Sequence, residues 1–269
     1  MAYGRRMVPE VGTVERWAWD YVLTTSLDGK LAPPLVPSLW EEAPPSRRVA
    51  APGRPPELRV VARAPKTRGL NAPMGRARAL HTFFHHELQA AELMAWAVLA
   101  FPETPRAFRE GLVRIATDEI RHMRMYGDAI ARLGSHVGAF EVRDWFWERF
   151  PACADPASFL ATMGLGIESA NLEHAATFAA KFREAGDEES ARVQELVGLE
   201  EIAHVRFGVR WFEHFRAEPL AFGPWQRSLV PPLSPLLMRG LPIQRDARLR
   251  AGQPSAFIDE LEAWKPPGS

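Results

Sequence analysis

The sequence predicts an all-α protein organised around a four-helix bundle, and two observations support this. First, four long helical stretches fit between residues 73 and 216, where Pro/Gly-rich turns separate them. Second, these stretches contain an internal repeat of glutamate and histidine residues. The organisation expected from both is an N-terminal extension (1–72), the bundle (73–216) and a C-terminal tail (217–269).

The N-terminal extension is expected to begin with a short helix, and its proline-rich part is expected either to wrap over another part of the protein or to stay mobile. Thr13 can cap a helix from Val14 to Leu27, which Gly29 would end. Three Pro-Pro pairs between residues 33 and 56 exclude continuous helix. Residues 47–78 carry nine Arg and Lys residues against one Glu. This basic stretch is either a solvated connection or a flap that attracts an anionic substrate or RNA.

The first two bundle helices are predicted to form a hairpin. Pro73 can open a helix from about Met74 to Phe101. The turn at 102–105 ends it, and a second helix runs from about Pro105 to Leu133, before Gly134. Because the connection is short, the two helices should be antiparallel neighbours.

The second pair of helices follows a long aromatic-rich connection at 134–156. A third helix should run from a cap at Asp155 to Ala185, ended by Gly186. A fourth covers about Asp187 to Phe215. A long crossover between helices two and three is a known variant of four-helix bundles. The proline-containing tail, with a short helix near 255–264, should pack on the outside.

The repeat consists of Glu-x4-Glu on one helix and Glu-x-x-His on the next. Its first copy is Glu87, Glu92, Glu119 and His122, and its second is Glu168, Glu173, Glu201 and His204. The copies are offset by 81 residues (168 minus 87) and by 82 (201 minus 119). One Glu plus one Glu-x-x-His from each hairpin is the ligand set of a dinuclear carboxylate site.

Spacing selects between the paired glutamates in one hairpin only. Glu87 and Glu119 are level across the turn at 102–105, whereas Glu92 lies about 7 Å nearer that turn and about 140° around the helix. Glu87 is therefore the predicted ligand. In the second hairpin the repeat register favours Glu168 and the symmetry about the turn favours Glu173, so spacing leaves both open.

The predicted ligands also suit the charge of two divalent ions. Glu and His three residues apart share one helix face. Four ionised glutamates balance two divalent cations, and without metal so many buried carboxylates would be very unfavourable. Imidazole with carboxylate suits iron or manganese, so we expect two Fe ions, with Mn/Fe or Mn/Mn as alternatives.

Several segments resemble one family. They are His81-x3-His85-x-Glu87-Leu-Gln-Ala-Ala-Glu92-Leu, Asp118-Glu119-Ile-Arg-His122, Ile167-Glu168-Ser-Ala-Asn-Leu-Glu173, Glu200-Glu201-Ile-Ala-His204-Val and Arg245-Asp-Ala-Arg-Leu-Arg-Ala-Gly252. Together they look like the bacterial ferritin-like proteins of domain-of-unknown-function family 455, distant relatives by fold of the di-iron tRNA hydroxylases. The resemblance covers residues 79 to the C-terminus.

That resemblance implies a ferritin-like bundle and gives the metal-binding role to six residues: Glu87, Glu119, His122, Glu168, Glu201 and His204. It thereby favours Glu168 over Glu173. Arg143-Asp-Trp-Phe-Trp147 in the crossover and Ala170-Asn171 in the third helix depart from the family pattern, which affects expectations about a substrate pocket.

Composition narrows the functional classes. Net charge is zero, there is one cysteine, and no apolar run is long enough for a membrane span. We therefore expect a cytoplasmic protein without membrane contact. The function expected first is an O2- or peroxide-using oxidoreductase, a hydroxylase or oxidase of a small molecule, with an electron-donor reductase as a candidate partner.

Other functions remain open from the sequence. They are ferroxidase activity, metal handling, peroxide removal and a metal-free helical scaffold. A tRNA substrate rests only on analogy and on the basic stretch, and a homodimer is a further candidate state.

Overall fold

The computed structural model describes residues 8–63 and 69–266. Its regular elements are helices, and in these two ranges backbone pairing between extended segments is limited to isolated bridges, Thr13 with Leu39 and Val60 with Val142. The chain divides between Pro151 and Ala152 into two compact units, which are described separately. The all-α prediction is confirmed, and each unit contains one long helical hairpin.

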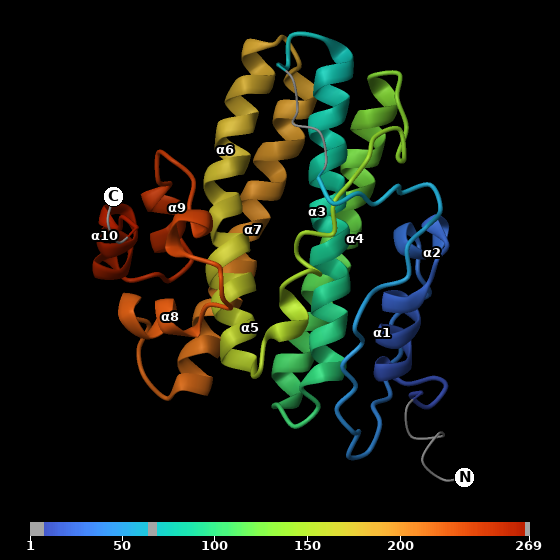
Figure 1. Ribbon diagram of the computed structural model, residues 1–269, viewed down its shortest axis with the longest axis vertical. Helices are drawn as coiled ribbons and strands as arrows, with labels where there is room; N and C mark the ends of the chain where they lie inside the picture. Colours follow the sequence, from blue (N-terminus) through green and yellow to red (C-terminus); the bar gives the residue numbers. More distant parts are fainter. Residues whose placement is uncertain (1–7, 64–68, 267–269) are drawn as a thin grey trace. The chain divides into compact units, whose positions relative to one another are not determined.

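The hairpin of the first unit pairs α3 (Pro73–Ala100) with α4 (Arg106–Arg132). The two helices run side by side from the tight turn that joins them (Figure 1). Pro73 occupies the first turn of α3, where its missing N–H costs no hydrogen bond. Helix α3 is buried along most of its length, whereas α4 keeps an exposed polar face. The predicted boundaries of both helices are correct to within about a residue.

The N-terminal segment forms two short helices, so the single helix predicted from Val14 to Leu27 is wrong. Helix α1 (Val14–Leu23) starts at the Thr13 cap and packs against α3. It ends when Thr24 adopts an extended conformation, and Ser26 then caps α2 (Leu27–Leu31) by accepting from the Gly29 amide. Ser26 caps a second helix, so Gly29 lies inside that helix and does not end the first one.

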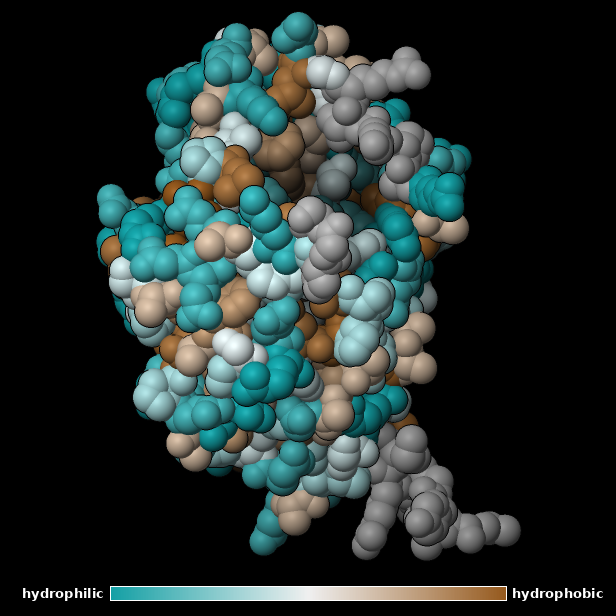
Figure 2. All heavy atoms as spheres, turned by 60° about the vertical axis from the view of Figure 1, so that its left-hand side comes forward, coloured by the Kyte–Doolittle hydropathy of each residue, from teal (hydrophilic) through white to brown (hydrophobic). Residues whose placement is uncertain are grey.

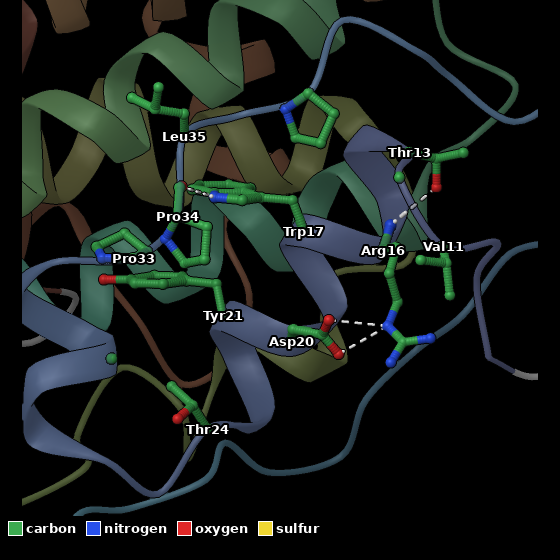
Figure 3. A pocket seen from close by; sticks show the side chains of 13 residues that line it. Val11, Thr13, Arg16, Trp17, Asp20, Tyr21, Thr24, Pro33, Pro34 and Leu35 are labelled. Atoms are coloured by element: carbon green, nitrogen blue, oxygen red, sulfur yellow. Dashed lines mark hydrogen bonds and ion pairs between the residues drawn. The ribbon is translucent and has the colours of Figure 1, made fainter.

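The following proline-rich segment lies on an aromatic pair of α1. The rings of Trp17 and Tyr21 are stacked with 5.5 Å between their centroids. The Trp17 indole N–H donates to the carbonyl of Pro34 at 2.9 Å, and Figure 3 shows Pro33 and Pro34 beside the two rings. A cavity of about 320 Å³ adjoins this contact. This part of the proline-rich segment therefore packs on α1 within the first unit.

The crossover forms hydrogen bonds with polar side chains on one face of α3. His81 accepts from the Gly138 amide at 2.8 Å, and the Gln89 side chain accepts from the Phe146 amide at 3.0 Å. Residues at positions 81, 85, 89 and 92 of α3 recur every three or four residues and therefore share a face. A 3₁₀ turn, η2 (Phe150–Ala152), follows at the boundary of the units.

The second unit contains α5 (Pro156–Thr162), the π-helix η3 (Met163–Ile167) and α6 (Glu168–Glu184) in direct succession. They correspond to the predicted third helix, which begins in a capping box at Asp155. Gly186, with φ of +75°, ends it, and α7 (Glu188–Arg216) returns alongside. The π segment was not predicted.

The C-terminal tail has more structure than the single helix expected. It contains α8 (Phe222–Ser228), η4 (Pro235–Met238), α9 (Arg245–Arg250) and α10 (Ser255–Ala263). These elements pack on α5, α6 and α7. The buried Trp225 donates its indole N–H to the Ala161 carbonyl at 3.0 Å and meets the Phe257 ring edge-on. The tail therefore completes the core of this unit.

Glycines allow η3 and α7 to cross closely. A Cβ built on Gly164 would lie 3.0 Å from the Gly208 Cα, and one on Gly208 would lie 3.1 Å from the Gly164 Cα. Side chains at these positions would therefore force backbone apart.

Polar and apolar side chains are interspersed on the face shown in Figure 2. In the described part of the chain, every helix is too short or too polar to cross a membrane.

Candidate metal-binding half-sites

The first unit brings together three of the six predicted ligands. Glu87 comes from α3, and Glu119 and His122 come from α4. Each offers one ligand atom, and these atoms lie within 4.8 Å of one another. All three side chains are buried, with exposed fractions of 5%, 0% and 0%. His122 Nδ1 is 2.8 Å from Glu119 Oε2, as the shared helix face requires.

The second unit repeats this arrangement with Glu168 of α6 and with Glu201 and His204 of α7. Their ligand atoms also lie within 4.8 Å of one another, and all three residues are buried. His204 Nδ1 is 3.1 Å from Glu201 Oε2. We call each set of two glutamates and one histidine a half-site.

Two local features of the second half-site were missed from sequence. The Asn171 side chain donates to Glu201 Oε1 at 3.1 Å, so it fixes one carboxylate oxygen. Its position three residues after Glu168 was an available signal. The π-helix η3 ends directly before Glu168, and π-helical turns are frequent at functional sites.

Glu92 is held by cations of the N-terminal extension. It is fully buried and pairs with Lys30 Nζ at 2.7 Å and with Arg54 Nη1 at 2.5 Å. Trp147 adds an indole N–H bond at 2.8 Å. Burial lowers the pKa of Lys30, although the Glu92 carboxylate opposes this. Glu92 is therefore engaged in an ion-pair network rather than exposed to solvent.

Glu173 has the equivalent partner in the second unit. It forms a bidentate ion pair with Arg248 of α9, at 2.6 and 2.8 Å, and both side chains are fully buried. The backbone amides of Gly240 and Gln244 also donate to it. The carboxylate thus accepts four hydrogen bonds from the tail.

The two copies of the repeat therefore use their paired glutamates in the same way. In each, the second Glu is neutralised by a cation from outside the hairpin, and the first joins the half-site. This supports Glu87 over Glu92 and Glu168 over Glu173 as candidate ligands.

The nearby histidines of α3 and α6 have other partners. His81 accepts from the Gly138 amide, and burial lowers its pKa to about 4. His85 Nε2 lies 2.9 Å from Asp144 Oδ1, and burial lowers the His85 pKa. His86 stacks on Phe146. Burial also lowers the pKa of His174.

The basic stretch at 47–78 contributes several ion pairs to the first unit. Arg47 pairs with Glu41, Arg54 pairs with Asp144 as well as Glu92, and Arg59 lies 3.6 Å from Glu141. Lys66 and Arg68 lie outside the described residues. Three of the nine basic side chains of this stretch are therefore matched by acids of the same unit.

The donor chemistry of each half-site fits a divalent transition-metal ion. Two carboxylates carry two negative charges, and imidazole nitrogen with carboxylate oxygen suits Fe or Mn. Burial is costly for uncompensated anions, and a bound cation would compensate their charge.

Comparison with known proteins gives one result. A family model described as "Protein of unknown function (DUF455)" matches residues 16–259. No match was found among curated proteins or among solved structures.

Proposed function

The chain belongs to this family of unknown function, DUF455, and we propose that it is a metal-dependent oxidoreductase that binds two redox-active ions through its two half-sites. The observation that carries the proposal is the repeated set of buried Glu, Glu and His donors in both units. From the internal repeat we expect each half-site to bind one ion.

The protein residues would bind and orient the ions. Glu119 and Glu201 each contact the histidine one turn later, and these contacts help to orient both side chains. Asn171 restricts Glu201 further by donating to its Oε1. Buried donors exclude competing water from their positions. Bound iron or manganese would supply redox chemistry toward O2 or peroxide.

The proposed activity is oxidation or hydroxylation of a small organic substrate. The test is O2 consumption by protein loaded anaerobically with Fe(II), measured with and without a panel of small organic compounds. We expect about two Fe per chain and uptake that increases with one class of compound. Glu201→Ala should lose both properties.

The matched control is Glu195→Ala, which removes an exposed carboxylate from the same helix. It should keep the metal and the uptake. The oxidoreductase proposal would be refuted if wild-type protein bound iron but consumed O2 at a rate that none of the compounds changed. Oxidation of many Fe(II) ions per chain would instead identify metal handling.

A further inference from the structure

A second cavity, of about 450 Å³, lies between α3 and the crossover in the first unit. Thr82 and His85 of α3 line it, as do Arg143 and Trp145 of the crossover, together with Arg63. A volume of this size accommodates a small organic molecule.

His85 provides the buried polar group of this cavity. It is 2% exposed, and its Nε2 is fixed by Asp144, which in turn receives two hydrogen bonds at 2.9 Å from Arg54 Nε. Burial alone would raise the pKa of Asp144, but the His85 and Arg54 contacts outweigh this and lower it. Because Asp144 is an acceptor, the Nε2 atom carries the proton and the Nδ1 atom presents a lone pair.

That lone pair has no hydrogen-bond partner among residues 8–63 and 69–266. A buried acceptor without a donor is unfavourable by about 1 to 3 kcal/mol. A donor O–H or N–H group, from a water or from a ligand in the cavity that His85 lines, would satisfy this atom.

The rest of the lining favours a negative charge elsewhere on that ligand. Arg63 and Arg143 are cationic, and the one lining carboxylate, Glu141, lies 3.6 Å from the guanidinium of Arg59. Arg143 uses Nε and Nη2 to bind Glu148. Trp145 adds an aromatic surface, one side of which is covered by Arg149. Planar apolar groups pack well on such surfaces.

We propose that this cavity binds a small hydroxy- or amino-carboxylate, with its hydroxyl or amine donating to His85 Nδ1 and its carboxylate near Arg63 and Arg143. The site is separate from the first half-site, because residues 85 and 87 project about 160° apart on a helix. The inference goes beyond the proposed metal chemistry, and its test does not require loaded metal.

The test measures binding of three related probes to the full-length protein by ligand-observed NMR titration. Mandelate has the hydroxyl, the carboxylate and an aromatic ring. Phenylacetate lacks the hydroxyl, and benzyl alcohol lacks the carboxylate. We expect mandelate to bind saturably and about fivefold more tightly than either, as one hydrogen bond or one exposed ion pair would give.

Two variants separate the contributions. His85→Gln places an amide N–H near the original Nε2 atom and removes the Nδ1 acceptor, so it should abolish the preference for mandelate over phenylacetate. Arg63→Gln should reduce the preference for mandelate over benzyl alcohol. Arg192→Gln, at a 71% exposed arginine of α7, is the control and should change neither.

Three results would overturn the proposal. They are absence of saturable mandelate binding below about 10 mM, equal affinity of wild type for mandelate and phenylacetate, and an unchanged preference in His85→Gln. The wild-type comparison decides the question even if His85→Gln does not fold. A crystal structure showing only an ordered water on Nδ1 in saturating mandelate would also refute it.

Discussion

The Glu173–Arg248 pair gives the sharpest test of how the tail is attached. Replacing Arg248 by Met keeps much of the side-chain volume but leaves the Glu173 carboxylate buried without its cation. Only the backbone amides of Gly240 and Gln244 would still donate to it. Removing one partner of a buried ion pair costs about 3 to 5 kcal/mol.

Both side chains are fully buried, so solvent screening does not reduce this cost. The Arg248 guanidinium also donates to the Ser169 and Met238 carbonyls, which lose a donor in the variant. We therefore expect the free energy of unfolding to fall by about 3 to 5 kcal/mol. For a chain of this size, that lowers the Tm by about 6 to 20 °C.

The assay is urea unfolding followed by circular dichroism, with a double-mutant cycle. Glu173→Gln combined with Arg248→Met removes the stranded charge and should recover at least half of the lost stability. Arg192→Met is the exposed control, with a change within about 0.5 kcal/mol. If Arg248→Met lost less than about 1 kcal/mol of unfolding free energy, or if the double variant recovered none of it, Glu173 would not depend on Arg248 for its burial.

Three further predictions concern stability. Burial lowers the pKa of His81 from 6.5 to about 4, so between these pH values the unfolded state binds a proton that the folded state excludes. The free energy of unfolding should therefore fall by about 3 kcal/mol from pH 6.5 to 4. In unfolding measured against pH, His81→Gln should show a shallower slope of stability with pH, and an equal slope would contradict this. Gly208→Ala should destabilise in thermal melts because its Cβ meets the Gly164 backbone. Gly127→Ala should stabilise by about 0.5 to 1 kcal/mol, because its Cβ would make only an ordinary contact, 3.8 Å from Val137 Cγ2, and stabilisation by both variants would be the contrary result. Lys30→Met should lower the unfolding free energy by about 2 to 4 kcal/mol, and unchanged urea midpoints would show that the buried pair contributes nothing.

The two hairpins could be predicted because strong local signals mark their ends. Pro73, the turn at 102–105 and Gly186 act through backbone restrictions that hold in any context. The repeat similarly placed Glu119 and His122 on one helix face, and the structure puts their side chains in contact.

Long-range partners could not be predicted from spacing. Arg248 is 75 residues from Glu173, and sequence offered no rule that joins an arginine of the tail to one of two candidate glutamates. Lys30 and Arg54 are likewise too far from Glu92 along the chain for local spacing to pair them. These partners decide which glutamate of each copy is neutralised, so spacing alone could not choose between Glu168 and Glu173, and before the structure only the family resemblance favoured Glu168.

The π-helix η3 and the shortened α1 were missed for local reasons. A five-residue π segment has no distinctive composition, and here it lies between two regular helices. At the end of α1, the Ser26 cap and Gly29 gave competing signals within four residues.

Metal binding at both half-sites can be tested by anomalous diffraction from crystals of freshly purified protein, recorded at the Fe and Mn absorption edges. We expect two peaks per chain, one in contact with Glu87, Glu119 and His122 and the other with Glu168, Glu201 and His204. Carboxylates without any anomalous peak, in protein also exposed to Fe(II) and Mn(II), would contradict it.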